Sequence, residues 1–445
     1  ADTLDGGDGA DTLDGGSHDD VMNGGVGDDN LLGGGGADTL NGGDGVDGVD
    51  YSQSEEGVQV DLAAGTGAGG DADSDVLANI ENVTGSAHGD VLTGDNGANA
   101  LSGGAGADTL VGGGGVDVLD GGAGVDVADF VAAVNGVLVD LAVGTSSDGA
   151  TLSGIENVHG GAGADTLNGD AGENALSGNG GSDVLDGDAG NDSLDGGAGD
   201  DTLNGGSGVN TLAGGSGADL FEISSSGGGS NTISDFNDVS GDRIRLSAGS
   251  DVDETAAVVQ ALQGQSLSGD DAYFSYGGGS HTVSGLTRAL TYLDFGLSSF
   301  TISPVSASVS ETNGVASYQI YRTGDLSRDA SVELDFSGST AVAGVNYDEP
   351  PVKVLNFGKG ERTKTIEVNL RVNAQTSGSD AMLSVALINA VLGIVEGAPA
   401  TTTIIDDDDL LLKGTDNDDL LTGDIGDDTL VGYGGDDTLL GLAGE

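Results

Sequence analysis

The chain has 445 residues, and its 75 Asp and Glu against 11 Lys and Arg give a formal net charge of −64. This charge excludes nucleic acid as a partner, because no basic patch exists to meet phosphates, and no apolar run reaches the roughly 18 residues of a membrane-spanning helix. Cysteine is absent, which excludes disulfides and thiolate metal sites and is typical of a secreted protein stabilised by metal. So acidic a chain repels itself when compact, which predicts that bound divalent cations are linked to folding.

A nine-residue phrase starts at Gly6 and occurs five times without a break to Asp50. Its pattern is Gly-Gly-x-Gly-x-Asp-x-U-x, in which U is a large apolar residue. Glycine permits the left-handed backbone of a sharp six-residue turn, and the last three positions form a short strand with one inward side chain. Two phrases therefore make one coil with a strand on each side, and stacked coils align the position-eight residues in a thin core.

Position six of the phrase is predicted to bind a metal ion. Position-six residues two phrases apart stack along one edge, where carboxylates and glycine carbonyls of adjacent turns surround a hard cation. Calcium takes about six to eight oxygens and tolerates such an irregular cage, whereas magnesium demands a tighter octahedron. The predicted ligands are Asp11, Asp20, Asp29, Asp38, Asp47, Asp90, Asn99, Asp108, Asp117, Asp126, Asp165, Asn174, Asp183, Asp192, Asp201, Asn210, Asp219, Asp419, Asp428 and Asp437.

Two alternatives qualify this site prediction. Asn at position six keeps a carbonyl oxygen but loses a charge, so Asn99, Asn174 and Asn210 are predicted to form weaker sites. A disordered acidic linker is the competing interpretation of the whole repeat region, but disorder needs no nine-residue frame. Disorder is the state that we expect without calcium.

The frame divides the chain into repeat blocks and other segments. The blocks are residues 1–50, 85–129, 160–222 and 409–445. Residues 51–84 and 130–159 each contain an alternating, strand-like stretch and end in Ile-Glu-Asn-Val. We interpret them as two copies of one β insert that packs on the roll and rejoins it; ligand binding is the less favoured role. Because the chain begins and ends in mid-phrase, we expect it to be a piece of, or a product from, something longer.

Two further regions have no glycine frame. Residues 223–300 are predicted to cap the roll, with a helix at Asp253–Gln263 and strands at Tyr273–Tyr276, His281–Ser284 and Ala289–Leu293. Residues 301–408 alternate at the spacing of an antiparallel β-sandwich. Its predicted strands are Ala316–Tyr321, Ser331–Phe336, Val352–Phe357, Thr363–Leu370, Met382–Ile388 and Thr401–Ile405. The predicted fold class is therefore all-β, a parallel β-roll plus an antiparallel sandwich.

The sequence contains no local signature of catalysis. The motifs His-Glu-x-x-His and Gly-x-Ser-x-Gly are absent, and nothing local supports a Ser/His/Asp triad. His18 stands where the fourth-position glycine belongs, and we interpret it as a sign of a relaxed turn rather than as a metal ligand. The sequence therefore predicts no enzyme.

The repeats resemble the RTX, hemolysin-type calcium-binding repeats of bacterial proteins exported by type I secretion. The resemblance implies a calcium-bound β-roll that is disordered before export and folds outside the cell. Residues 301–408 resemble a Calx-β domain at Ser310–Gly314, Tyr321–Gly324, Ala343–Tyr347, Asn356–Glu361 and Ile405–Asp408. That resemblance implies calcium ligands at one end of the sandwich, which are Glu311, Asp406, Asp407 and Asp408.

This Calx-β-like segment departs from the family pattern at two places. Asn346 stands where the family usually has Asp, and the acidic cluster expected around residues 373–380 is reduced to Asp380. These departures predict that the domain holds fewer calcium ions or acts as a spacer.

Three functions are compatible with these features. The favoured one is a secreted, calcium-rigidified structural or adhesive protein of a surface layer, matrix or filament. It would self-associate head to tail, because the two chain ends together nearly complete one phrase. The alternative is a calcium-dependent secretion and folding module of a larger toxin, enzyme or adhesin. Carbohydrate or receptor binding is least favoured, because only 4% of the residues are aromatic.

Overall fold

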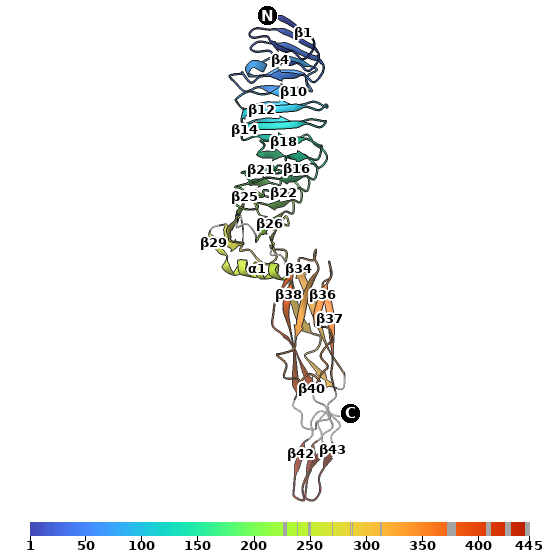
Figure 1. Cartoon of the computed structure of the whole chain (residues 1–445). Helices are drawn as coiled ribbons and strands as arrows, with labels where there is room; N and C mark the ends of the chain where they lie inside the picture. The colour runs from blue at the N-terminus through green and yellow to red at the C-terminus, as the bar shows by residue number, and fades with distance from the viewer. Residues whose placement is uncertain are drawn as a thin grey trace. The chain divides into compact units, whose positions relative to one another are not determined.

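The structure is a computed structural model that describes residues 1–225, 229–237, 239–247, 251–268, 270–284, 286, 288–311, 314–371, 380–405, 411–422 and 429–440. The chain forms two compact units. The first unit contains residues 1–247 and 261–290, and the second contains residues 248–260 and 291–445. Both units are built of β-strands, and the single α-helix of the described residues is α1 (Asp251–Gly264), besides a short 3-10 helix at Gly70–Ala72 (Figure 1). No helix among the described residues is long and apolar enough to span a membrane.

The first unit is a parallel β-roll in which one coil contains two phrases. Thr3 in β1 (Thr3–Asp8) lies opposite Val21 in β3 (Val21–Val26), and Leu13 in β2 (Thr12–Asp14) lies opposite Leu31 in β4 (Asn30–Leu32). Both pairings are parallel and join residues that are two phrases apart in the sequence. Successive phrases therefore alternate between two sheets, which confirms the predicted coil.

The strands of the roll belong to two sheets. In chain order, the first sheet contains β1, β3, β5 (Thr39–Asp44), β7 (Gln59–Asp61), β8 (Thr66–Ala68), β9 (Val76–Ala78), β11 (Val91–Thr93), β13 (Thr109–Val111), β15 (Val127–Asp129), β19 (Asn157–His159), β21 (Ala175–Ser177), β23 (Ser193–Asp195), β25 (Val209–Ala213), β27 (Ser230–Ile233), β29 (Ser266–Ser268), β30 (Asp271–Tyr276) and β31 (Gly279–Val283). The second contains β2, β4, β6 (Gly48–Asp50), β10 (Asn82–Thr84), β12 (Ala100–Gly106), β14 (Val118–Gly124), β16 (Leu138–Asp140), β17 (Thr145–Ser146), β18 (Thr151–Ser153), β20 (Thr166–Asn168), β22 (Val184–Asp186), β24 (Thr202–Asn204), β26 (Leu220–Ser224) and β28 (Arg243–Ser247).

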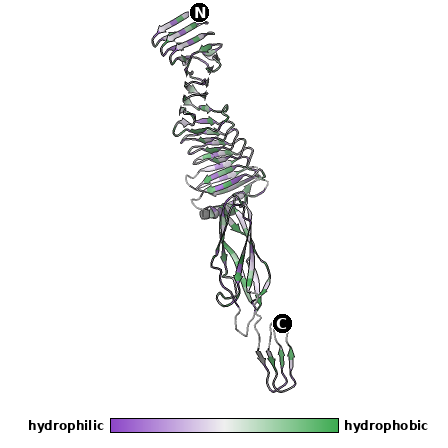
Figure 2. Ribbon diagram, turned by 90° about the vertical axis from the view of Figure 1, so that its right-hand side faces the viewer, coloured by the Kyte–Doolittle hydropathy of each residue, from purple (hydrophilic) through white to green (hydrophobic). Residues whose placement is uncertain are grey.

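One apolar side chain per phrase forms the core of the roll. The position-eight residues from Leu13 to Phe221 are all buried, for example Leu31, Leu110 and Leu203 at 0% exposure. The residues on either side of each are only partly buried, and Figure 2 shows hydrophobic and hydrophilic residues side by side along the coils of the roll. Because each coil contributes only two such side chains, the apolar core is thin, and the turns must supply the remaining stability.

The two inserts are part of the sheets, so the expected excursion that packs on the roll is wrong. In the first insert, β9 pairs with β5, β7 pairs with β11, and β8 lies between β7 and β9 in antiparallel pairing. The insert thus places three strands in the first sheet where an ordinary coil places one. Its close, β10, pairs with β6 and β12 in the second sheet. The strands stay in the sheets because Val60, Leu77 and Val83 continue the row of core residues.

The second insert has the same three-stranded arrangement in the opposite sheet. In this copy β18 pairs with β14, β16 pairs with β20, and β17 lies between them, all in the second sheet. Five phrases separate the two inserts. Because that number is odd and phrases alternate between sheets, the second copy is inserted on the other side of the roll.

The region after the repeats continues the roll before it ends. Strands β26 and β28 pair in parallel, and so do β25 and β27 and then β27 and β31. The predicted helix is present as α1, and two of the predicted strands are present as β30 and β31. The strand predicted at Ala289–Leu293 is wrong. Residues 292–296 form a turn, and the Asp294 carboxylate accepts hydrogen bonds from the N–H and hydroxyl of Thr291 at 2.7 and 3.0 Å.

The second unit contains an antiparallel β-sandwich. One sheet has the order β37 (Thr363–Asn369), β34 (Val315–Gly324), β32 (Ser298–Pro304) and β39 (Gly393–Val395). The other has the order β33 (Ser308–Ser310), β40 (Ala400–Ile405), β38 (Ala381–Val391), β35 (Ala330–Asp335) and β36 (Val354–Phe357). All six predicted strands are present; β32, β33 and β39 were missed, and β32 starts before residue 301. Phe300, Tyr318 and Phe357 are fully buried between the sheets.

Polar contacts attach the first part of α1 to this sandwich. The Arg328 guanidinium donates to both oxygens of Glu254, at 2.9 and 3.1 Å. The backbone N–H of Leu392 donates to the Thr255 hydroxyl at 3.0 Å.

The last repeats form two parallel strand pairs. Strand β41 (Leu411–Lys413) pairs with β43 (Thr429–Val431), and β42 (Leu420–Thr422) pairs with β44 (Thr438–Leu440). Each pairing again joins residues that are two phrases apart.

Candidate metal centre

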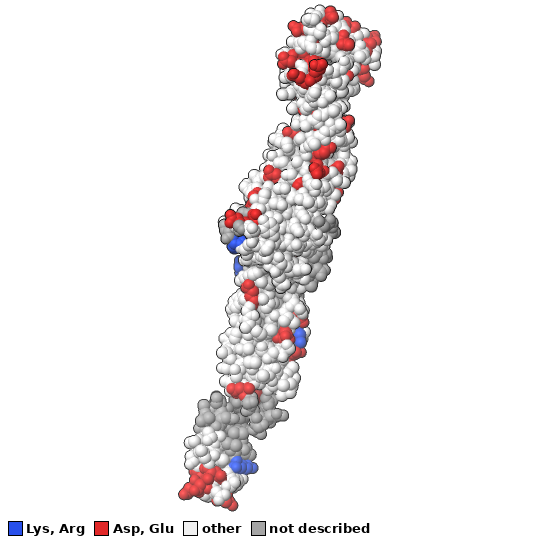
Figure 3. All heavy atoms as spheres, turned by 90° about the vertical axis from the view of Figure 1, so that its left-hand side faces the viewer, with Lys and Arg blue, Asp and Glu red and all other residues white. Residues whose placement is uncertain are grey.

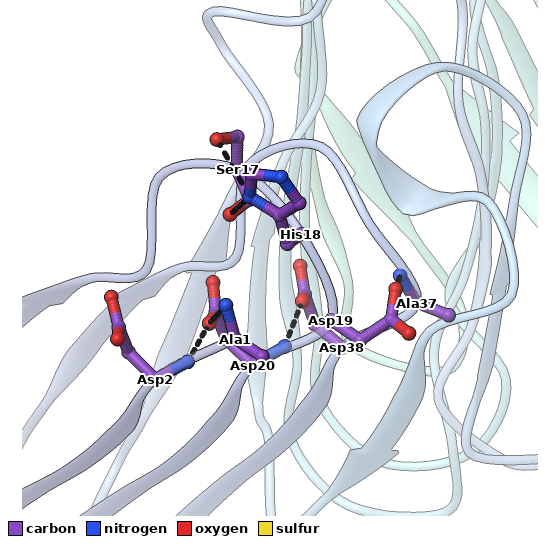
Figure 4. A network of polar contacts seen from close by, with 8 residues as sticks. All are labelled: Ala1, Asp2, Ser17, His18, Asp19, Asp20, Ala37 and Asp38. Carbon is purple, nitrogen blue, oxygen red and sulfur yellow. Dashed lines mark hydrogen bonds and ion pairs between the residues drawn. The ribbon is translucent and has the colours of Figure 1, made fainter.

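Position-six side chains of successive coils form two hydrogen-bonded columns along the edges of the roll. In each step the Oδ1 atom accepts a hydrogen bond from the backbone N–H of the position-six residue one coil earlier. Asp20 N–H donates to Asp38 at 2.7 Å, a step that Figure 4 shows beside the one from Asp2 to Asp20. On the other edge, Asp29 N–H donates to Asp47 at 2.7 Å.

These steps recur with nearly constant geometry. The N–O distances lie between 2.7 and 3.0 Å for the pairs Asp90–Asp108, Asp108–Asp126, Asn99–Asp117, Asp165–Asp183, Asp183–Asp201, Asp201–Asp219, Asn174–Asp192, Asp192–Asn210 and Asp419–Asp437. The structure therefore brings the predicted residues together in columns. Asp428 lies outside the described residues.

In most aspartates of the two columns, the second carboxylate oxygen is buried and has no hydrogen-bond partner among the described residues. This orphan Oδ2 is found in Asp11, Asp20, Asp29, Asp38, Asp47, Asp108, Asp126, Asp183, Asp192, Asp201 and Asp219. A buried charged oxygen without a partner is costly, so each of these positions calls for a positive ligand. Residues 1–242 contain no Lys and no Arg, so no basic side chain of the repeats can be that ligand.

Each orphan oxygen lies beside the first glycine of its own turn and faces the next coil. A Cβ atom placed on Gly24 would lie 2.4 Å from Asp29 Oδ2 and 2.5 Å from the carbonyl oxygen of Gly42. On Gly196 the corresponding distances are 2.4 Å to Asp201 Oδ2 and 2.8 Å to a backbone carbonyl oxygen. Glycine is required here because a side chain would occupy the space in which carboxylate and carbonyl oxygens converge. We call the position-six side-chain oxygen beside this glycine the cradle oxygen.

The chemistry of this donor set fits calcium. Among the described residues no three Asp, Glu, His or Cys side chains come together as a metal cluster. The donors that do converge are one carboxylate per turn and backbone carbonyls, all of them hard oxygens. Calcium accepts such mixed, irregular oxygen sets, whereas tetrahedral zinc sites use nitrogen and sulfur.

Burial raises the pKa of these carboxyl groups, because it disfavours their charged form. Hydrogen bonds from backbone N–H groups oppose the shift, and nearby carboxylates add to it. The pKa is raised to about 6 in Asp108, Asp192, Asp201 and Asp219, and it is also raised in Asp38, Asp47, Asp117 and Asp183. Acidic side chains also lie on the exposed surface with few basic ones beside them (Figure 3), so a cation meets a negative surface as it approaches.

The backbone distinguishes two kinds of turn. All eleven turns that end in an orphan oxygen have a left-handed second residue, such as Gly25 at φ 113° and Gly197 at φ 94°. We call these open turns. In the turns 85–90, 94–99, 160–165, 169–174 and 414–419 the second residue is not left-handed. Its N–H donates to the cradle oxygen of the same turn, and we call these closed turns.

The predicted ligands therefore differ in their surroundings. Asp90 and Asp165 lie in closed turns, and both of their carboxylate oxygens accept backbone hydrogen bonds. Asn99 and Asn174 also lie in closed turns, and their amide nitrogens donate to the carbonyl oxygens of Glu81 and Glu156 at 3.0 and 2.8 Å. The amide nitrogen of Asn210 donates to Asn231 Oδ1 at 3.1 Å.

Four carboxylates of the columns were missed because they lie outside the glycine frame. Asp75, Glu81, Glu156 and Asp242 accept the N–H bonds of Asp38, Asp47, Asp126 and Asp219, respectively. Each lies two positions before a buried core residue, namely Leu77, Val83, Val158 and Ile244. That spacing is the one between positions six and eight of the phrase, so it could have identified them.

The predicted site in the sandwich is described only in part. Glu311 is buried at 1% exposure, whereas Asp406, Asp407 and Asp408 lie outside the described residues. Asn346, the departure from the family pattern, accepts a hydrogen bond from Val342 N–H at 2.9 Å. Calcium ligation by this group stays a prediction.

The contacts of two histidines, His18 and His281, are with neighbouring backbone and side-chain groups of the fold. His18 has a left-handed backbone, φ 85°, and its exposed ring contacts Ser17 rather than the carboxylates of the column (Figure 4). His281 was not predicted to have a role. It is buried, and its Nδ1 accepts a hydrogen bond from Asn231 N–H at 3.2 Å, which continues the column of Asn210.

Comparison with protein families gives two matches. A model described as the RTX calcium-binding nonapeptide repeat in four copies matches residues 1–31, 23–52, 84–128, 151–185, 186–221 and 413–445. A model described as the Calx-beta domain matches residues 297–408. The repeat match that starts at residue 151 lies within the second insert, in agreement with the position of β18 in the sheet.

Solved structures match parts of the chain. The apo form of the Calx CBD1 domain is 25% identical and covers 24% of this chain and 98% of its own, with a TM-score of 0.22. The CBD12 structure from CALX1.2 is 21% identical and covers 27% of this chain and 50% of its own, with a TM-score of 0.23. The extracellular lipase LipA from Serratia marcescens is 20% identical and covers 47% of this chain and 38% of its own, with a TM-score of 0.18. The comparison with curated proteins gives no match.

Proposed function

Because this chain carries RTX calcium-binding nonapeptide repeats and a Calx-beta domain, we propose that it is a secreted structural or adhesive protein that folds on extracellular calcium. It would form part of a bacterial surface layer, matrix or filament. Calcium is its cofactor, and the matched repeat and domain types are calcium-binding rather than catalytic. The observation that supports the proposal best is the recurrence of the orphan carboxylate oxygen in three stretches of the roll, residues 11–47, 108–126 and 183–219, because it spreads the requirement for metal over many turns rather than over one site.

The physical basis is the coupling of metal binding to folding. The columns hold carboxylates close together in a segment without Lys or Arg, so their mutual repulsion opposes the compact coil when no metal is bound. A ligand that binds the folded chain stabilises it in proportion to the logarithm of its free concentration, summed over the sites. Such coupling would keep the chain unfolded during type I export and let it fold where calcium is abundant.

Self-association and attachment to the cell surface are the finer parts of the proposal. The outer faces of both sheets expose valines at position seven, among them Val21, Val118 and Val184 at 45 to 50% exposure. These faces suit packing of one molecule against another. A calcium-dependent folding module of a larger toxin, enzyme or adhesin is the competing assignment. The size of the species formed in calcium separates the two assignments.

Sedimentation velocity in EGTA and then in millimolar calcium is the test. We expect a slow, expanded species in EGTA and large species in calcium that chelator disperses. A compact monomer in calcium would favour the folding module, and an unchanged profile would overturn calcium-coupled folding altogether.

A charge-matched pair of variants shows whether the columns cause the change. The column variant replaces four orphan-bearing residues, Asp183, Asp192, Asp201 and Asp219, by Asn. The control replaces four outward, position-nine residues, Asp14, Asp120, Asp186 and Asp195, by Asn. Both lose four charges, so only the column variant should need more calcium to fold.

A further inference from the structure

The turns that follow each insert show a repeated arrangement of hydrogen bonds. Glu81 precedes Asn99 by the length of two phrases, and Glu156 precedes Asn174 by the same length. In both pairs the glutamate carboxylate accepts a column N–H at 2.8 Å, from Asp47 or Asp126. The glutamate carbonyl oxygen accepts the asparagine amide N–H, at 3.0 Å from Asn99 and at 2.8 Å from Asn174.

The orientation of the two asparagine amides follows from their neighbours. The Oδ1 atom of Asn99 accepts the N–H of Asp95 at 2.8 Å, and that of Asn174 accepts the N–H of Asp170 at 2.8 Å. Each asparagine amide has a backbone N–H on one side and a glutamate carbonyl oxygen on the other. Only one of the two amide orientations lets its oxygen accept from the N–H while its nitrogen donates to the carbonyl. The nitrogen therefore faces the glutamate carbonyl oxygen, and an amide nitrogen is not a ligand for calcium.

The second residue of these turns also affects the cradle oxygen. Asp95 and Asp170 stand where open turns have a left-handed residue, and neither has a positive φ. Each accepts the N–H of the fourth residue through its Oδ1 atom, Gly97 or Gly172, at 2.7 Å. This conformation directs the second N–H at the cradle oxygen, which takes the contact that an open turn leaves for metal.

We infer that the two turns after each insert, residues 85–99 and 160–174, close on hydrogen bonds in place of calcium and divide the columns into separately loaded blocks. Asp90 and Asp165 accept two backbone N–H bonds each, and Asn99 and Asn174 use both ends of their amides. The columns become open again in the third turn, at Asp108 and Asp183. This inference rests on the proposed calcium-dependent folding and replaces the prediction that Asn99 and Asn174 are weak calcium ligands.

At the C-terminal end of one column, Asn210 also uses both ends of its amide in hydrogen bonds. Asn210 Oδ1 accepts Asp192 N–H at 2.9 Å, its nitrogen donates to Asn231 Oδ1, and Asn231 N–H donates to His281. A Cβ atom on Gly205 would lie 2.7 Å from Asn210 Nδ2 and 2.5 Å from Asn231 Oδ1. A donor nitrogen and its acceptor thus occupy the space beside this glycine, where open turns hold the cradle oxygen.

Counting bound calcium tests the inference. The full chain is dialysed against buffered free calcium, and metal per chain is measured for wild type, for Asn99→Ala with Asn174→Ala, and for Asp108→Ala with Asp183→Ala. We expect the asparagine variant to bind as many ions as wild type and the aspartate variant to bind fewer. A loss of ions in the asparagine variant would overturn the inference.

Two controls keep the result interpretable. Circular dichroism in saturating calcium reports whether each variant is folded. If the variant with Asn99→Ala and Asn174→Ala is not folded, bound calcium is counted in Asn99→Ser with Asn174→Ser instead, because a hydroxyl can donate to the same carbonyl oxygen. An unchanged number of bound ions supports the inference, and a lower number overturns it. If wild type and the aspartate variant bind equally few ions, calcium-dependent folding itself fails, and the two failures are thus distinguishable.

Discussion

At the scale of single residues, the two inserts differ by a coordinated pair of substitutions. In the first, the Tyr51 hydroxyl donates to Asp75 Oδ2 at 3.0 Å, and both side chains are 2% exposed. In the second, Phe130 takes the place of the tyrosine and Ala150 that of the aspartate, two positions before the core residue Leu152. Hydroxyl and carboxylate are thus lost together, as expected if each is costly to bury without the other.

Replacement of Tyr51 by Phe tests this dependence. The change leaves Asp75 Oδ2 buried without its donor, and we expect a loss of roughly 1–3 kcal/mol in the free energy of unfolding, measured by urea denaturation in saturating calcium. In the background of Asp75→Ala the same change should cost clearly less. Equal costs in the two backgrounds would show that the pair is not coupled.

At the scale of elements, the thin core makes each position-eight residue important. Leu110 is fully buried, and its replacement by Ala leaves a cavity that the neighbouring coils cannot fill. We expect a loss of about 2–5 kcal/mol in the free energy of unfolding. Val118, at position seven, is 47% exposed, so Val118→Ala is the control and should cost less than about 1 kcal/mol. Urea denaturation in calcium measures both, and similar losses would contradict the single-row core.

The coil, the core row and the position-six columns could be predicted because a strict repeat forces equivalent residues into equivalent places. Two features could not. In the step at Asn99 the side chain donates to a backbone carbonyl, whereas in the aspartate steps the side chain accepts a backbone N–H. This reversal occurs because the Glu81 peptide presents its carbonyl oxygen there, and that orientation depends on the path of the insert. The sequence predicts inserts that pack on the roll, rather than strands within its sheets, because the missing glycines hide the spacing of Asp75 to Leu77 and of Glu81 to Val83, which keeps these strands in the sheets.

At the scale of the whole roll, the raised pKa values predict an unusual dependence on pH. Burial raises the pKa of Asp108, Asp192, Asp201 and Asp219 from 3.8 to about 6. A raised folded-state pKa means that the protonated form is favoured by folding. Without calcium, this stabilisation is complete below about pH 3.8 and is lost as the pH rises through about 6.

We therefore expect the calcium-free chain to have more β structure and a higher Tm at pH 4.5 than at pH 7.5, by circular dichroism in EGTA. Protons compete with calcium for the same oxygens, so calcium affinity should fall as the pH drops below about 6. The variant with Asp183, Asp192, Asp201 and Asp219 replaced by Asn should show a smaller pH effect. A calcium-free chain that is more ordered at pH 7.5 would contradict the burial of these carboxyls.

The alternation of phrases between two sheets gives the roll a parity. The second insert lies in the opposite sheet to the first because an odd number of phrases separates them. Loss or gain of one phrase would move everything downstream to the other side of the roll, whereas loss or gain of two would keep every downstream element on its own side. Surface features of such a chain can therefore be shifted along it by whole coils, and transferred between its sides by single phrases.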